Sequence, residues 1–190
     1  HFFTLRFQLS ATPAASREEL LRVFELAARR KALAFIHMRS AGEVEPGGSI
    51  DALQEVLANV AATGASVHIV HIGSNGLRQT PRLLSMIDGA RARGLDVTTE
   101  VYPYTAASTY LQSALFEPGW QQRFAIGFND VQWSATGERL TEESFGRYRK
   151  QGGLVVIHMI PEDSVKAAIR HEGVMIGSDG VPLTNGGGHP

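Results

Sequence analysis

Runs of apolar residues, separated by turn-forming residues, recur along the chain and predict β-strands. Residues 3–9 alternate between apolar and polar side chains, which is the pattern of a strand with one covered face. The later runs are continuous and apolar, as in strands that are buried on both faces. These later strands are expected at 33–36, 66–72, 95–101, 154–157 and 174–177.

Helical patterns lie between the strands, and most of them begin or end with a recognisable signal. Residues 16–19 form a Ser-Arg-Glu-Glu capping box before an apolar stripe that contains Leu20 and Phe24. Ser49 is expected to cap the second helix and Gly64 to end it, because these residue types favour those positions. Further helices are expected at 80–94, which opens with Thr-Pro and stops at a glycine, and at 141–150 and 161–171.

The alternation of strands and helices favours a parallel sheet covered by helices, within one domain that spans 1–190. Between 105 and 140 the pattern weakens, which indicates a long excursion over the mouth of the domain. In a closed β/α barrel all strand ends converge on one face, whereas a doubly wound sheet gathers only those near its switch point. Five expected strands are followed by polar side chains, namely His37, His71, Tyr102, His158 and Asp179.

A barrel is the better interpretation because the chain lacks the glycine fingerprints of nucleotide-binding sheets. Residues 73–76, Gly-Ser-Asn-Gly, match neither the dinucleotide fingerprint nor the phosphate-binding loop with its lysine. We therefore predict the α/β class, with a (β/α)8 TIM-type barrel. About six strand–helix units are present, and 190 residues fall below the roughly 250 that are typical of eight units. We expect a fragment that lacks the first strands of the barrel.

Composition narrows the class of protein further. Hydrophobic residues make up 43% of the chain and its formal net charge is −1, which favours a globular domain and argues against nucleic-acid binding. No apolar run is long enough to span a membrane, and we expect a cytoplasmic protein. The absence of cysteine excludes a disulfide framework, a thiolate nucleophile and cysteine metal ligands within these residues.

Two of the strand-end residues are the strongest candidates for chemistry. His71 follows a β-branched strand, so it is either a metal ligand or catalytic group, or a core histidine bonded to a backbone carbonyl. Asp179 lies in a Ser-Asp-Gly sequence, which suits either an exposed, closely placed acid or a turn aspartate that caps the backbone. His68 alternates with His71 along the strand and is expected to be structural.

His37, His158 and Arg39 are candidates for substrate binding. The two histidines either bind substrate or orient their neighbours. Arg39 either pairs with a substrate carboxylate through two parallel hydrogen bonds or forms an ion pair with Glu43 or Glu45.

Several of these short sequences, taken together, resemble the N-acyl-D-amino-acid deacylases, which are D-aminoacylase-like members of the amidohydrolase superfamily. They occur in the order of the family, and the resemblance covers the chain from about Ser16 onward. The matching sequences are His37-Met38-Arg39, Ile69-Val70-His71, Gly94 to Thr98, Tyr102 to Thr109, Ile176 to Gly180 and Gly188-His189-Pro190.

The resemblance implies a zinc-dependent (β/α)8 barrel that hydrolyses the amide bond of N-acyl-D-amino acids, for example N-acyl-D-glutamate. It places His71 at the end of the fifth barrel strand, as a zinc ligand. It places Asp179 at the end of the eighth, as the carboxylate that takes a proton from the attacking water and passes it to the leaving amine. It also implies that Ser108 lies near the substrate carboxylate. These roles agree with the chemistry of zinc, which binds imidazole well and activates water near neutral pH.

The chain also departs from the pattern of that family. The superfamily's His-x-His and the family's metal-binding cysteine or acidic residue would both precede residue 1. Tyr102 stands where some members carry a second metal-binding histidine, and a phenol with a pKa of about 10 is a poor zinc ligand. We therefore expect one zinc ion in the complete protein, with Tyr102 in the substrate pocket. After His-Met-Arg the chain continues Ser-Ala-Gly, where many members have Ser-Glu-Gly.

Two other interpretations remain open. A cyclic-amide hydrolase of the dihydroorotase type would use the same strand-end histidine and aspartate on a different substrate. A truncated, non-catalytic barrel would bind no metal. In the enzymatic interpretations the partner is a small molecule, and neither nucleic acid nor a membrane is involved.

Overall fold

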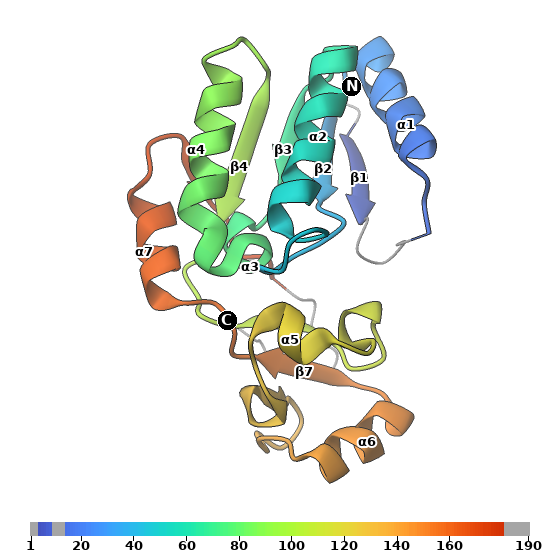
Figure 1. Cartoon of the computed structure of the whole chain (residues 1–190), viewed down its shortest axis with the longest axis vertical. Coiled ribbons are helices and arrows are strands. Elements are labelled where there is room, and N and C mark those ends of the chain that lie inside the picture. Colours follow the sequence, from blue (N-terminus) through green and yellow to red (C-terminus); the bar gives the residue numbers. More distant parts are fainter. Residues whose placement is uncertain (1–3, 9–13, 181–190) are drawn as a thin grey trace.

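The computed structural model describes the backbone of residues 4–8 and the whole of residues 14–180 (Figure 1). The closing Gly-His-Pro of the sequence resemblance lies outside these residues. Figure 1 shows two parts, a larger one built on parallel strands and helices and a smaller lobe below it. No helix among the described residues is long and apolar enough to cross a membrane.

The larger part is a five-stranded parallel sheet, here called the main sheet. Its strands pair in the order β1 (Thr4–Gln8), β2 (Leu33–His37), β3 (Val67–Ile69), β4 (Val97–Val101) and β8 (Val174–Ile176). The helices that connect or precede these strands are α1 (Arg17–Arg30), α2 (Ser49–Thr63), α4 (Thr80–Arg91) and α7 (Glu162–Arg170). The α/β class is therefore confirmed, and the described strands form an open sheet, which is not a complete barrel.

Helices cover one face of the main sheet. Strand side chains point alternately to its two faces, so every second residue of a strand packs against these helices. Ala34, Ile36, Val67 and Ile69 are fully buried in one core with apolar residues of α1, α2 and α4. The intervening side chains point to the other face, where Leu33 is 37% and Met175 48% exposed. The main sheet thus has one helix-covered face and one face that the described helices leave open.

Local signals in the sequence set most of the helix ends. The Ser16 hydroxyl accepts a hydrogen bond of 3.0 Å from the Glu19 backbone N–H at the start of α1, as the capping box predicts. Gly64 ends α2 in the left-handed conformation, also as predicted. Ser49 does not cap α2, and this prediction is wrong. Gly48 is the N-cap instead, and the buried Ser49 side chain already belongs to the first turn.

The third strand is shorter than the sequence predicts, and the loop after it is helical. The strand ends at Ile69, and residues Ile72–Gly76 form the short helix α3, followed by the 3₁₀ turn η2 (Leu77–Gln79). Gly76 allows this turn to pack tightly, since a Cβ there would lie only 2.7 Å from the Thr80 hydroxyl oxygen. His71 is thereby placed at the junction between strand and helix.

Residues 105–160 form the smaller lobe, which holds a separate antiparallel sheet. Its strands pair in the order β5 (Ala107–Tyr110), β7 (Leu154–Ile157) and β6 (Val131–Trp133). Its helical segments are η3 (Ala114–Phe116), α5 (Trp120–Phe124), η4 (Phe128–Asp130) and α6 (Glu142–Gln151). The prediction of 154–157 as a parallel barrel strand is therefore wrong, because β7 pairs with two strands of the lobe.

Aromatic packing explains why this segment folds apart from the main sheet. The Trp120 and Phe145 rings stack with their centroids 5.4 Å apart, and Phe116 and Phe128 pack edge-on against them. Such aromatic groups bury a large apolar area in favourable ring geometries. Residues 105–140, which lack a helical or strand period, therefore supply much of a second hydrophobic core.

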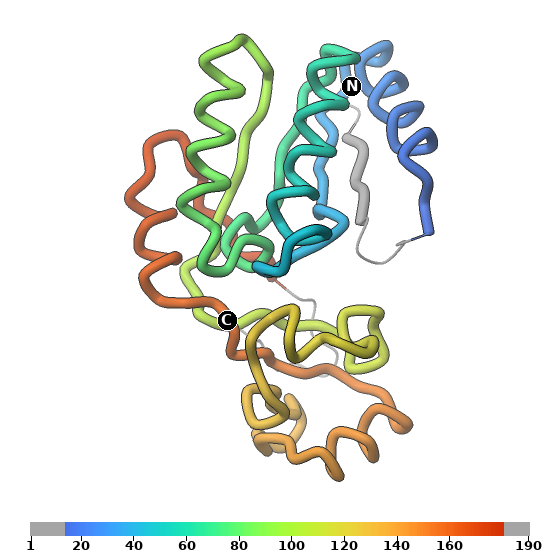
Figure 2. Tube along the Cα trace, in the orientation of Figure 1, coloured from blue at the N-terminus to red at the C-terminus, as the bar shows by residue number. Residues whose placement is uncertain are grey.

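The chain leaves the main sheet after β4, traverses the lobe, and returns through α7 to β8 (Figure 2). The strands β4 and β8 pair directly, so no strand of the main sheet separates Tyr102 from Asp179. Only β4 lies between β3 and β8 in the main sheet, so the assignments of His71 to the fifth barrel strand and of Asp179 to the eighth cannot both hold. If β8 is counted as the eighth strand, β3 is the sixth, and His37 on β2 takes the fifth place.

Two glycines of the lobe offer a matched test of this packing. Gly153 has a φ of +153°, and a Cβ there would overlap the buried Trp133 ring. We expect Gly153→Ala to destabilise the protein by about 1–3 kcal/mol, as overpacking does. Gly146 lies within α6 with open space around it, so Gly146→Ala should instead stabilise by about 0.5–1 kcal/mol. Urea denaturation measures both, and equal effects of the two substitutions would contradict the contact between Gly153 and Trp133.

Candidate active site

A cavity of about 360 Å³, here called the histidine cavity, lies at the C-terminal ends of the main strands. His37 ends β2, His71 follows β3, Tyr102 follows β4 and Asp179 follows β8. All four residues line the cavity, together with Ser108 of the lobe. Strand ends of the main sheet therefore bring four of the five predicted polar groups together.

His71 is held in one orientation by its neighbours in α3. Its φ of 35° and ψ of 58° are left-handed, a conformation in which histidine is more frequent than most residues. The Ser74 hydroxyl lies 2.9 Å from His71 Nδ1 and donates to the His71 carbonyl oxygen at 3.0 Å. The Asn75 side-chain nitrogen lies 3.4 Å from the same Nδ1, so this ring nitrogen is engaged by residues of α3. A metal ion would therefore bind at Nε2.

His37 and His71 form a pair of neutral imidazoles. Their ring centroids lie 4.4 Å apart with an interplanar angle of 72°. Burial lowers the pKa of His71 to about 4. Burial and then the neighbouring His71 lower the pKa of His37 to about 4 as well, against the opposing charge of Asp179. Both rings are thus uncharged at neutral pH, which is the state that binds a metal ion.

Tyr102 and Asp179 complete the polar wall of this cavity. The Tyr102 side chain is 5% exposed, and burial raises the pKa of its phenol, which also hydrogen-bonds with Ser74. Asp179 is exposed, and its carboxylate lies close enough to influence the pKa of both His37 and Tyr102. Its backbone φ is +46°, which aspartate tolerates better than most residues. A negative group therefore lies near the neutral His37 ring and the protonated Tyr102 phenol.

A second cavity of about 370 Å³, here called the side pocket, adjoins the first. Tyr102, Ser108 and Asp179 line both cavities. His158 lines only the side pocket, so it does not join the other strand-end residues, because its strand β7 belongs to the lobe. The Ser108 hydroxyl donates to the Val155 carbonyl oxygen at 3.1 Å, and it would have to rotate before it could donate to a substrate carboxylate.

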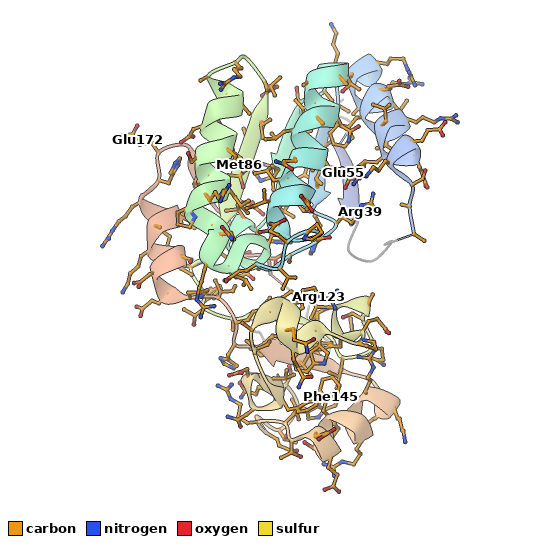
Figure 3. All side chains as sticks on the ribbon, in the orientation of Figure 1. Arg39, Glu55, Met86, Arg123, Phe145 and Glu172 are labelled. Carbon is orange, nitrogen blue, oxygen red and sulfur yellow. The ribbon has the colours of Figure 1, made fainter. Side chains whose placement is uncertain are left out.

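Arg39 lies outside the residues that line either cavity. Its guanidinium donates two hydrogen bonds, of 3.0 and 3.1 Å, to the Glu55 carboxylate of α2 (Figure 3). A further hydrogen bond of 2.8 Å reaches the Ala15 carbonyl oxygen before α1. Arg39 thus joins α2 to the start of α1, and it pairs with Glu55, an acidic residue that was not among those considered from the sequence.

The donor types in the histidine cavity suit a zinc ion, since neutral imidazole is among its preferred ligands. Nε2 of His71 is available for this role because Nδ1 is engaged by Ser74. Among residues 14–180, no three histidine, cysteine, aspartate or glutamate side chains gather closely enough to hold a metal ion.

The sequence did not single out Ser74, although its position three residues after His71 on a helical turn is a readable signal.

No family model matches the chain. It is 27% identical over 184 residues to an N-acyl-D-glutamate deacylase of Alcaligenes xylosoxydans xylosoxydans, covering 88% of the chain and 36% of that protein. The crystal structure of N-acyl-D-glutamate deacylase from Bordetella bronchiseptica, complexed with zinc and a phosphonate mimic of the tetrahedral intermediate, matches with a TM-score of 0.73. That match has 26% identity and covers 92% of the chain and 38% of that structure.

A crystal structure of D-aminoacylase, described as defining a subset of amidohydrolases, matches with a TM-score of 0.64 and 25% identity. That match covers 88% of the chain and 36% of the enzyme. The chain therefore spans between a third and two fifths of the length of each of these proteins. Over nearly all of its own length, the chain resembles D-aminoacylase-like amidohydrolases in both sequence and structure. This is the resemblance that its motifs predict.

Proposed function

We propose that the protein carrying this chain is a metal-dependent hydrolase of N-acyl-D-amino acids. The observation that carries the proposal is the pair of neutral imidazoles, His37 and His71, with the Asp179 carboxylate facing them at the ends of parallel strands. The similarity to N-acyl-D-glutamate deacylases and D-aminoacylase supports the class of substrate.

His37 and His71 are the residues of this chain that would hold the metal, which we propose is a single zinc ion. When bound, zinc supplies a Lewis acid for the acyl carbonyl and makes an attacking water available at neutral pH. His37 enters this proposal as a ligand rather than as a substrate-binding residue, because the structure brings its ring against that of His71. Ser74 engages Nδ1 of His71 and so leaves Nε2 for the metal.

Asp179 is the residue we assign to proton transfer. Its carboxylate is exposed and lies at the border of both cavities, where it can accept a proton from the attacking water. Cleavage of the C–N bond then requires a proton on the leaving nitrogen, and the protonated Asp179 supplies it. Tyr102 keeps its own proton because burial raises its pKa, so it is a poor second metal ligand. Its hydroxyl would have to leave Ser74 before it could donate to the substrate.

Substitution of Asp179 separates proton transfer from metal binding. Asp179→Asn keeps the shape of the side chain and removes the base, so we expect a loss of turnover between about 10² and 10⁴-fold with the zinc content unchanged. The measurement is hydrolysis of N-acetyl-D-methionine and N-acetyl-D-glutamate, together with metal analysis of each protein. Near-normal turnover in Asp179→Asn would show that another group transfers the proton.

Substitution of His71 should remove the metal itself. We expect His71→Ala to lose most of its zinc and its activity together, because one of few ligands is deleted. L-isomers and cyclic amides are assayed beside the D-substrates. Cleavage of cyclic amides alone would favour the dihydroorotase type of reaction, and a protein that purifies without zinc and cleaves none of these amides would be the non-catalytic barrel.

The lowered pKa values of the two histidines predict how stability depends on pH. The folded state prefers uncharged rings, whereas the unfolded chain binds protons near the ordinary pKa of 6.5. Stability is therefore fully present above pH 6.5 and falls as the pH decreases toward 4. At pH 5 each ring should cost up to about 2 kcal/mol of unfolding free energy.

Urea denaturation of the metal-free protein at pH 7 and pH 5, followed by circular dichroism, measures this loss. A His37→Gln/His71→Gln variant should lose less stability between the two pH values, whatever its stability at pH 7. An equal loss in both proteins would mean that other groups account for the pH dependence.

A further inference from the structure

The side pocket lies where one arm of the proposed substrate must go. It shares Tyr102, Ala107, Ser108 and Asp179 with the histidine cavity. An amide whose nitrogen is protonated by Asp179 would lie at this shared border, from which one of its substituents can reach the side pocket. Its volume of about 370 Å³ is sufficient for an amino-acid side chain, since pockets for whole small molecules begin at about 300 Å³.

The charges around the side pocket disfavour an acidic substituent. Among the described residues that line it, none is a lysine or arginine, and Asp179 contributes a negative charge at its border. The nearby cation Arg139 is exposed, lies outside the lining, and donates a hydrogen bond of 3.2 Å to the Asn129 carbonyl oxygen. A carboxylate in the pocket would therefore lose water and approach the Asp179 carboxylate, and no lysine or arginine among the described lining residues would pair with it.

A chain of hydrogen bonds fixes the donor and acceptor character of His158, one of the polar residues that the lobe contributes to this pocket. The Gln132 side-chain amide donates to the Gly137 carbonyl oxygen at 3.2 Å, which identifies its nitrogen. The Gln132 carbonyl oxygen therefore faces His158, and it accepts a hydrogen bond of 2.9 Å from Nε2–H. Partial burial and the charge of Arg139 lower the pKa of His158. The ring is thus neutral, and its Nδ1 keeps a lone pair as an acceptor.

The remaining wall of the side pocket is largely apolar. Pro103, Ala106, Ala107 and Val156 line it beside the aromatic ring of Tyr104. Thr105 and Ser178 add hydroxyl groups to this lining, and the Asp179 carboxylate lies at its border. A lining of apolar groups with several hydrogen-bond acceptors, His158 among them, suits a side chain that has a methylene stem and an uncharged polar end that donates a hydrogen bond. The same features do not reject an apolar side chain, which would simply leave His158 in contact with water at the pocket opening.

We propose that the side pocket receives the side chain of the D-amino acid and selects uncharged side chains over acidic ones, with His158 and Gln132 as the residues that set this preference. The proposal rests on the proposed deacylase function and goes beyond it. It assigns this chain a specificity different from that named for the two N-acyl-D-glutamate deacylases to which it is similar.

The test compares two substrates of the same shape, N-acetyl-D-glutamine and N-acetyl-D-glutamate, with N-acetyl-D-methionine as the apolar reference. We expect kcat/KM for the glutamine derivative to exceed that for the glutamate derivative at least tenfold. In His158→Phe, which keeps a ring and removes the acceptor, the glutamine derivative should lose about tenfold in kcat/KM while the methionine derivative is nearly unchanged. His171→Phe, at the end of α7 and outside both cavities, is the control and should preserve the wild-type ratios.

A second, independent variant is designed to gain activity on the glutamate derivative. Gln132→Lys places a cation at the wall of the pocket, and it should raise kcat/KM for the glutamate derivative at least tenfold relative to the methionine derivative. Salt should weaken this gain, because the new attraction is electrostatic.

Three outcomes decide between the two proposals. If the glutamate derivative is cleaved as well as the glutamine derivative, or better, the selectivity is overturned and the deacylase function stands. If His158→Phe changes kcat/KM equally for all three substrates, His158 supports the fold and does not contact the substrate side chain. If no N-acyl-D-amino acid is cleaved by the zinc-loaded wild-type protein, the proposed function fails and this inference fails with it.

Discussion

The direct pairing of β4 with β8 is the constraint on which the candidate site depends. These strands are parallel, with Thr99 opposite Val174 and Val101 opposite Ile176, and the Gly177 backbone N–H donates to the Val101 carbonyl oxygen at 3.0 Å. The pairing brings the residue after β8 to the residues after β2 and β4, although more than seventy positions separate Val101 from Val174 in the sequence. Without it, Asp179 would not face His37 and Tyr102.

Much of the main sheet could be predicted from the sequence because its signals are local. The strand 33–37, the helix that opens at Ser16 and the glycine that ends α2 each depend on neighbours a few residues away. The mistake at 154–157 has a physical reason. The sequence Leu-Val-Val-Ile is typical of a buried strand in a parallel or an antiparallel sheet. Its pairing with β5 and β6 depends on contacts between residues that are distant in the sequence. A continuous apolar run carries no information about those partners.

In the candidate site, too, the local features could be predicted from the sequence and the long-range contacts could not. That His37, His71, Tyr102 and Asp179 follow strands is visible in the sequence, and the structure gathers these four residues around one cavity. Which of them are neighbours is not visible, because this depends on strand order. Arg39 also follows a strand, but its partner could not be predicted. Several acidic residues are near it in the sequence, and its ion pair with Glu55 depends on how α2 packs. Its ion pair, with the Glu55 side chain 9% exposed, ties α1 to α2 beside the site.

The point at which the lobe departs from the main fold has an evolutionary meaning. Its two ends are held together by a hydrogen bond of 3.1 Å from the Ile160 backbone N–H to the Thr105 carbonyl oxygen. A segment whose ends already meet adds little further closure entropy when its length changes. The lobe can therefore lengthen, shorten or be replaced while β4, α7 and β8 keep their places. Because Gln132, Val156 and His158 all come from the lobe, such exchange would alter what the side pocket accepts and leave the two histidines and the aspartate where they are.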